Sequence, residues 1–210
     1  AVNCKKVEIV KYLIEKGANP FIGSTIKSAI NIKSSNICDI LIKNIKNING
    51  FDENGFSFLD YVVSSDQFNS DLFISLIQSG AKLEQKNKHD DTSPFDIIVD
   101  ERNIDAIDKL AANGIPLDVA NRYSFTHAAS ELNNTSFLSY IINKGGNVNF
   151  QFNNAFPLYV SLKSKYVQQD DKSAFEDIKL LLNPTSFRDL FGKALVLLEN
   201  GADARKPFLQ

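Results

Sequence analysis

The chain has 210 residues, with 23 lysines and arginines against 25 aspartates and glutamates, so its formal net charge is −2. This balance excludes a nucleic-acid binder that works by neutralising phosphates, because such a surface needs an excess of basic residues. Hydrophobic residues make up 43% of the chain and charged residues 23%, as in globular proteins rather than disordered ones.

The two cysteines are too few for a disulfide scaffold or a cysteine-rich zinc site. We expect Cys4 and Cys38 to be buried structural thiols, because each falls in a segment with helical spacing of apolar residues. No apolar run approaches the roughly 20 residues that cross a bilayer, and no secretory signal segment opens the chain. We therefore expect a cytoplasmic protein without membrane insertion. The absence of methionine, even at position 1, indicates either a piece of a longer protein or methionines missing from the sequence.

A short phrase recurs along the chain: an apolar pair, two polar residues, a glycine, and then a small or apolar residue. Its copies lie at residues 13–18, 76–81, 110–115, 141–146 and 197–202. A degenerate copy at residues 41–46 has Ile45 in place of the glycine, so we expect that helix to end in another geometry. Until the last copy the spacing scatters around a period of about 33 residues, which is typical of repeat proteins.

A second phrase precedes these copies by the length of a helix pair. Its copies begin at Ser24, Ser57, Ser93, Ser124 and Phe156. A serine before a helix caps it through the side-chain oxygen, and a proline at the first helical position has no N–H to leave unpaired. We therefore expect a first helix at each copy. A second helix with one buried apolar stripe follows, and a glycine in the left-handed conformation ends it.

A unit of about 33 residues that starts with Thr-Pro-Leu-His-x-Ala and ends with Leu-Leu-x-x-Gly-Ala is the ankyrin repeat. On these two phrases the chain resembles the ankyrin-repeat family over nearly its whole length. In composition and in its degenerate repeats it resembles the ankyrin arrays of AT-rich intracellular bacteria, protists and large DNA viruses. The resemblance implies an all-α solenoid of about six helix-turn-helix units with short hairpin loops, whose second helices form the convex face.

The histidine of the starting phrase survives only as His127. Its places in the other copies hold Lys27, Asp60, Asp96 and Tyr159. In the family this histidine ties neighbouring loops together through hydrogen bonds. The resemblance therefore implies that His127 has this structural role and that the other repeats are less uniform.

The last third of the chain departs from the period. We assign residues 1–162 to ankyrin repeats, the first one partial, and residues 163–210 to an irregular C-terminal helical unit that continues or caps the solenoid. The polar insertion at residues 163–173 contains neither glycine nor proline. Here we expect an extended first helix, a polar turn, and a second helix that runs from Ser173 to Leu182.

Beyond Pro184 we expect one more helix. Thr185 or Ser186 would cap it, and it would end at Gly201.

The chain offers few side chains for catalysis. His89 lies in the polar stretch 86–91, which we place at a hairpin tip, either as a solvated loop residue or as a contact residue. The adjacent aspartate pairs at 90–91 and 170–171 have no partner histidine in the sequence pattern. No glycine-rich phosphate loop is present either. We therefore expect no catalytic, cofactor or metal site and no enzymatic activity in this chain.

Binding of a protein is better supported, because the repeat fold presents hairpin tips and first-helix faces as one concave surface. The candidate contact residues are Phe51, Glu53, Phe56, Lys86, Lys88, His89, Arg122, Tyr123, Phe150 and Phe152. We expect Tyr123 and Phe152 to be exposed. For Phe51, Phe56 and Phe150 two alternatives stay open: an exposed interface anchor, or a ring tucked between adjacent hairpins.

The sequence thus predicts a non-catalytic, monomeric protein–protein interaction module. Its partner is another protein, and a host protein is one candidate. One alternative is a targeting module of a larger multidomain enzyme or of a secreted, host-directed effector of an intracellular pathogen. A third hypothesis is an inert spacer.

Overall fold

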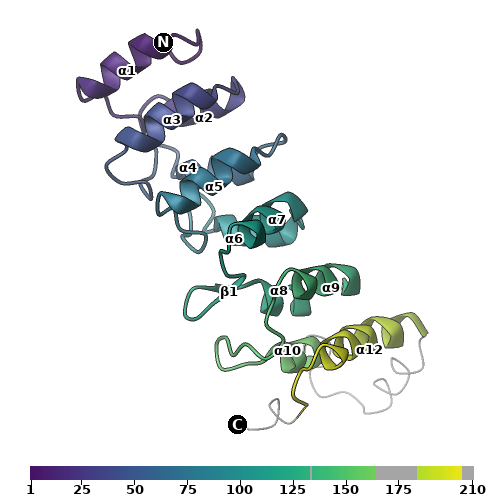
Figure 1. The fold of residues 1–210 in the computed structure, drawn as a ribbon. Helices are drawn as coiled ribbons and strands as arrows, with labels where there is room; N and C mark the ends of the chain where they lie inside the picture. Colours follow the sequence, from purple (N-terminus) through teal and green to yellow (C-terminus); the bar gives the residue numbers. More distant parts are fainter. Residues whose placement is uncertain (133, 164–183, 205–210) are drawn as a thin grey trace. The chain divides into compact units, whose positions relative to one another are not determined.

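The structure is a computed structural model that describes residues 1–132, 134–163 and 184–204 (Figure 1). These residues form helices joined by loops, with one short β-hairpin. The chain divides into two compact units, residues 1–109 and 110–210. The polar turn and the helix from Ser173 to Leu182 that the sequence predicts lie outside the described residues.

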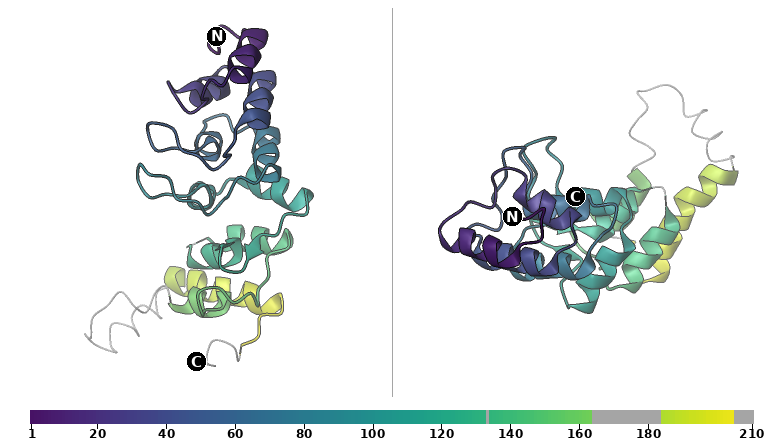
Figure 2. Two further views of the ribbon diagram at one scale, coloured as in Figure 1. Left: turned by 90° about the vertical axis from the view of Figure 1, so that its left-hand side faces the viewer. Right: turned by 90° about the horizontal axis from the view of Figure 1, so that it is seen from above.

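The first unit consists of helix pairs in two layers (Figure 2). Its elements are α1 (Val7–Glu15), α2 (Thr25–Asn31), α3 (Ser35–Asn44), α4 (Phe58–Val63), α5 (Ser70–Gln78), α6 (Pro94–Asp100) and α7 (Ile104–Ala112), which crosses the boundary between the units. The first helix of each pair packs on the next first helix, α2 on α4 and α4 on α6. The second helices stack in the same way, α1 on α3 and α3 on α5. This stacking is what the sequence period predicts.

The second unit contains the hairpin and the remaining helices. Its elements are β1 (Asp118–Val119), β2 (Tyr123–Ser124), α8 (Phe125–Glu131), α9 (Thr135–Asn143), α10 (Pro157–Lys163) and α12 (Pro184–Glu199). The two strands are antiparallel, with Asp118 opposite Ser124 and Val119 opposite Tyr123. Helix α8 packs on α9 and α10, and α12 packs on the same two helices.

Serine caps start the first helices at three of the predicted places. The hydroxyl oxygens of Ser57, Ser93 and Ser124 each accept a hydrogen bond of 3.2 Å from the backbone N–H three residues later. At α4 and α6 the third residue is an aspartate that accepts the serine N–H in return, which completes a capping box. Ser24 departs from the prediction: its φ is 55°, and its side chain makes no capping bond.

Left-handed glycines end the second helices, as predicted. Gly80 follows α5 with a φ of 92°, and Gly145 follows α9 with a φ of 104°. A side chain at these positions would be strained, because only glycine adopts such angles without a steric penalty. Ile45 follows α3 in an extended conformation, with φ −69° and ψ 120°, which confirms the expected different ending.

The apolar stripes of the second helices form the core of each unit. Leu76 in α5 and Ile141 in α9 are fully buried. The expectation that the apolar stripe is buried is wrong for Leu13, which is 44% exposed although Val10 in the same helix is buried. Helix α1 is the first described helix and packs on α3, so only one side of its apolar stripe is covered.

Two further expectations need correction. Cys4 is exposed, because it lies in the turn before α1 and not within a helix, whereas Cys38 in α3 is buried as expected. Thr185 and Ser186 lie inside the first turn of α12, because that helix already begins at Pro184.

Candidate functional site

The hairpin loop at residues 51–56 is held in shape by one carboxylate. Asp52 Oδ1 accepts hydrogen bonds of 3.0 Å from the N–H groups of Asn54 and Phe56, and Oδ2 accepts one of 2.7 Å from the Tyr61 hydroxyl. Burial by itself raises the pKa of Asp52, but these hydrogen bonds outweigh it and hold the pKa below its usual value. Burial and the bond to Asp52 raise the pKa of Tyr61 to about 12. The sequence therefore builds a fixed loop from which side chains can point outward.

The next hairpin, at residues 86–92, lies directly against the first. The buried Asn87 side chain accepts hydrogen bonds from the N–H groups of His89 (2.8 Å) and Asp90 (2.9 Å), which shapes the tip. The Lys88 N–H donates to the carbonyl of Gly55 at 2.8 Å. A Cβ at Gly55 would come within 3.1 Å of the Lys88 and His89 backbone, so the close contact requires glycine there.

This contact places the predicted aromatic residues between the two hairpins. Phe51 and Phe56 are half-buried. The Lys88 ammonium lies 5.0 Å from the centre of the Phe51 ring, and the His89 ring lies 4.9 Å from that of Phe56. Both phenylalanines therefore pack against the neighbouring hairpin and stay partly exposed, which combines the two alternatives left open by the sequence.

The charged candidates of this unit lie at the tips. Glu53, Lys86, Lys88 and His89 are exposed. Lys86 pairs with Asp91 at 2.7 Å, both side chains being well exposed to solvent. Exposed pairs of this kind contribute little to stability, so they are available to contact a partner.

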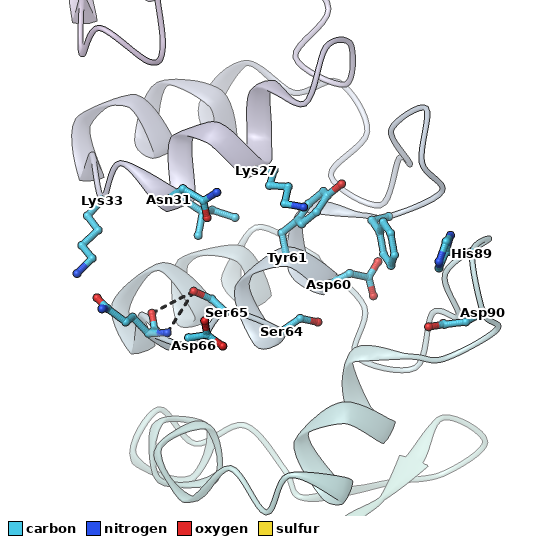
Figure 3. A pocket seen from close by; sticks show the side chains of 13 residues that line it. Lys27, Asn31, Lys33, Asp60, Tyr61, Ser64, Ser65, Asp66, His89 and Asp90 are labelled. Atoms are coloured by element: carbon cyan, nitrogen blue, oxygen red, sulfur yellow. Dashed lines mark hydrogen bonds between the residues drawn. The ribbon is translucent and has the colours of Figure 1, made fainter.

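Behind these tips, the first helices border a pocket of about 700 Å³. Figure 3 shows Asp60, Tyr61, His89 and Asp90 at one end of it and Lys33 at the other. The Lys27 ammonium lies 5.9 Å from the centre of the Tyr61 ring. The pocket thus carries aromatic surface together with groups of both charges.

Asp60 is the least solvated charged side chain of this pocket, with 1% of its surface exposed. Its Oδ2 accepts the Ser57 N–H at 2.6 Å as part of the capping box, whereas Oδ1 has no hydrogen-bond partner. Burial raises the pKa of Asp60, and the negative charge of Asp90 raises it further. In the sequence Asp60 stands out only as a departure from the family histidine.

In the second unit, Tyr123 is buried, contrary to expectation. Only 4% of its surface is exposed, its ring packs edge-on against Phe125 with centroids 5.8 Å apart, and its hydroxyl donates to the Pro116 carbonyl at 3.2 Å. The register of the β1–β2 hairpin turns this ring inward. The neighbouring Arg122 is exposed and lies 5.8 Å from the centre of the tyrosine ring.

His127 links two successive loops, as the family resemblance implies. Its Nε2 lies 2.8 Å from the carbonyl oxygen of Ala155, in the next hairpin, and its Nδ1 lies 3.1 Å from Ser124 Oγ. Burial lowers the pKa of His127, so the neutral ring is favoured. The Phe152 ring lies 5.7 Å from the histidine ring and is half-buried rather than exposed; Phe150 is half-buried as well.

Polar side chains that the sequence analysis missed join further loops. Asn49 Nδ2 donates to the Gly80 carbonyl at 2.9 Å, and its Oδ1 accepts from the Lys82 N–H at 2.9 Å. Asn149 makes the same pair of bonds to Gly201 and Asp203, each at 2.8 Å. The available signal was the shared Asn-x-Asn phrase at residues 47–49 and 147–149.

Asp118 has a similar role in the second unit. It accepts the Thr126 N–H at 3.0 Å and the Asn147 N–H at 2.7 Å. Among the residues that the structure describes, no three His, Cys, Asp or Glu side chains gather where they could hold a metal ion. No helix in the described ranges is long and apolar enough to span a bilayer.

Helix pairs ended by left-handed glycines, stacked in two layers and joined by hairpins, define an ankyrin-repeat fold. No family model matches the chain, and no curated protein matches it. A solved structure is similar, described as the "Crystal structure of the ankyrin repeat domain of Bcl-3: a unique member of the IkappaB protein family". The two share 17% sequence identity with a TM-score of 0.63, over 98% of this chain and 86% of that chain. This likeness confirms the predicted fold, an all-α ankyrin-repeat solenoid.

Proposed function

We propose that this chain is a non-catalytic recognition module that binds another protein through its hairpin tips and first-helix faces. The observation that carries the proposal is the pair of joined hairpins at residues 51–56 and 86–92. Their phenylalanine rings are half-buried and already fixed, so binding would cost little side-chain entropy. Exposed charges surround these rings, and such charges set specificity and association rate.

The test compares two matched double variants of the whole chain. Phe51→Ala with Lys88→Ala removes an aromatic–lysine pair from the joined hairpins, where the ammonium lies 5.0 Å from the ring centre. Tyr12→Ala with Lys16→Ala removes a similar pair, at 5.5 Å, from the second helix α1. Circular dichroism and thermal melting first establish that both variants are folded. Parent and variants are then used to capture proteins from lysates, and captured proteins are identified by mass spectrometry.

We expect at least one protein that the parent and the α1 variant retain and that the hairpin variant loses. A dissociation constant raised about tenfold or more in the hairpin variant corresponds to at least 1.4 kcal/mol of binding energy, as expected for an interface anchor. Equal capture by all three proteins would contradict binding at the hairpins. No specific capture by any of them would favour the inert spacer.

We further propose that the chain acts as a monomer in the cytoplasm and does not bind nucleic acid. The alternative of a targeting module, joined to an enzyme or a host-directed effector, uses the same surface. It differs in requiring an activity in another part of a longer protein.

A further inference from the structure

The pocket beside the joined hairpins contains a buried hydrogen-bond acceptor without a donor. Asp60 Oδ1 has no hydrogen-bond partner, although only 1% of the surface of this residue is exposed. Leaving a charged acceptor unpaired away from water is costly, and buried polar groups in native proteins are normally paired. The carboxylate points toward His89 and Asp90, at one end of the pocket (Figure 3). A ligand that donates hydrogen bonds there would remove the penalty.

The surroundings of this carboxylate restrict the class of donor. Phe56 lies 5.4 Å from Tyr61 and 4.9 Å from His89, measured between ring centres, so aromatic faces line the wall. Asp90 adds a second carboxylate, whose pKa its hydrogen bonds within the turn hold below the usual value. This end of the pocket is therefore both aromatic and negatively charged.

Among the described residues, the lysines of the pocket form no ion pair with its carboxylates. Lys33 lies at the opposite end, and the Lys27 ammonium lies over the Tyr61 ring. The ligand best matched to the carboxylate end is a planar cation with several N–H donors.

We propose that this pocket binds an arginine side chain presented by the protein partner. A guanidinium is always charged, stacks on aromatic rings, and has five donors in a fixed plane, so it can serve both Asp60 and Asp90. An ammonium lacks the planar face, and we expect lysine to bind more weakly. The inference rests on the proposed function, because it names the partner group that this recognition surface would accept.

Binding requires one local movement. Because Asp60 is 1% exposed, a guanidinium reaches its Oδ1 only when a side chain of the pocket wall moves aside. His89 is exposed at a hairpin tip and stacks on Phe56, so it is the wall residue best placed to move. The backbone resonance of His89 should therefore report the event.

The test uses NMR titration of the isotope-labelled whole chain with three blocked tripeptides. They carry arginine, citrulline or lysine between two glycines; citrulline keeps the shape of arginine and removes its charge. We expect the arginine peptide to shift the amide resonances of Asp60, Tyr61 and His89 in a saturable way. Its affinity should exceed that of the citrulline peptide by about tenfold or more.

A pair of variants separates the pocket from the helix cap. Asp60→Asn keeps the shape of the side chain but removes its charge, and we expect it to lose the arginine response. Asp96→Asn changes the matching residue of the capping box in α6, which does not line the pocket, and we expect it to keep the response. Both variants weaken one cap, so unfolding by denaturant shows whether they are equally folded.

Three results would overturn the proposal: equal binding of arginine and citrulline, an equal loss in both variants, or no shift at about 10 mM peptide, well above a weak 1 mM dissociation constant. The capture experiment tells this failure apart from failure of the proposed function. If the hairpin variant loses a partner that Asp60→Asn retains at full affinity, protein recognition stands and the arginine pocket is refuted. If capture does not depend on the hairpins at all, the proposed function itself fails.

Discussion

At the scale of single residues, the same position in successive repeats is used for two different purposes. At His127 a ring nitrogen bonds the next loop through Ala155, whereas Asp60 and Asp96 in earlier repeats bond back to their own helix caps. A histidine can reach across to the next hairpin, while the shorter aspartate reaches only the serine three residues before it. His127 also contacts Ser124 in its own cap, so the aspartates keep the contact within the repeat and lack the one to the next repeat.

His127 makes a prediction about pH. Burial lowers its pKa below 6.5, although the bond to Ala155 and the nearby Asp118 favour the protonated form. The unfolded chain then takes up this proton more readily than the folded one, so stability is fully present above about pH 6.5 and falls as the pH drops toward the lower folded pKa.

We expect His127→Gln to reduce this loss of stability on acidification. Glutamine keeps an N–H donor for Ala155 but does not titrate. Denaturant unfolding of the chain at about pH 7.5 and pH 5 measures the difference, with His89→Gln as the control for the other histidine. An unchanged pH dependence in His127→Gln would contradict the assignment.

At the scale of helices, one stripe pattern has different consequences at different places. Leu76 in α5 is fully buried, whereas Leu13, at the matching place in α1, is 44% exposed. The pattern specifies which face of a helix is apolar. The neighbouring helices decide whether that face is covered.

This difference predicts unequal costs for the same substitution. Leu76→Ala should reduce the free energy of unfolding by about 2–5 kcal/mol, because it removes buried methyl groups and leaves a cavity. Leu13→Ala should cost less than about 1 kcal/mol, as exposed substitutions generally do. Urea unfolding followed by circular dichroism gives both values. Equal losses would show that the face of α1 carrying Leu13 is covered in solution.

At the scale of the whole molecule, loops far apart in sequence are joined by single hydrogen bonds, several of them from side chains, rather than by a continuous sheet. The described β-structure amounts to the β1–β2 pair and one isolated bridge. Asn49 and Asn149 each donate to the carbonyl of the next helix-ending glycine, 31 and 52 residues further along. These links fix each hairpin against its neighbour within its own unit.

We expect Asn49→Ala to reduce stability by about 0.5–1.5 kcal/mol and to speed amide hydrogen exchange at Lys82. The change removes the acceptor of the Lys82 N–H and the donor to the Gly80 carbonyl. The control is Asn54→Ala, at an exposed hairpin tip whose bonds stay within its own loop. If exchange at Lys82 were the same in both variants, Asn49 would not join the two loops in solution.

Local sequence predicted the repeat, three of the serine caps and the glycine helix ends. These are local features: a serine whose side-chain oxygen accepts from the N–H three residues later, or a glycine where φ must be positive, acts within one turn of chain. The phrases at Ser57, Ser93 and Gly80 therefore predicted their elements correctly.

Contacts in the folded chain set which side chains are accessible. The burial of Tyr123 depends on the β1–β2 hairpin, which packs its ring against Phe125, and the exposure of Cys4 on its place in a turn. The unpaired oxygen of Asp60 depends on the side chains that enclose it. Alternation and spacing indicate the direction in which a side chain leaves the backbone. Whether it meets water, a ring or a hydrogen-bond donor is settled by the residues that the fold brings next to it.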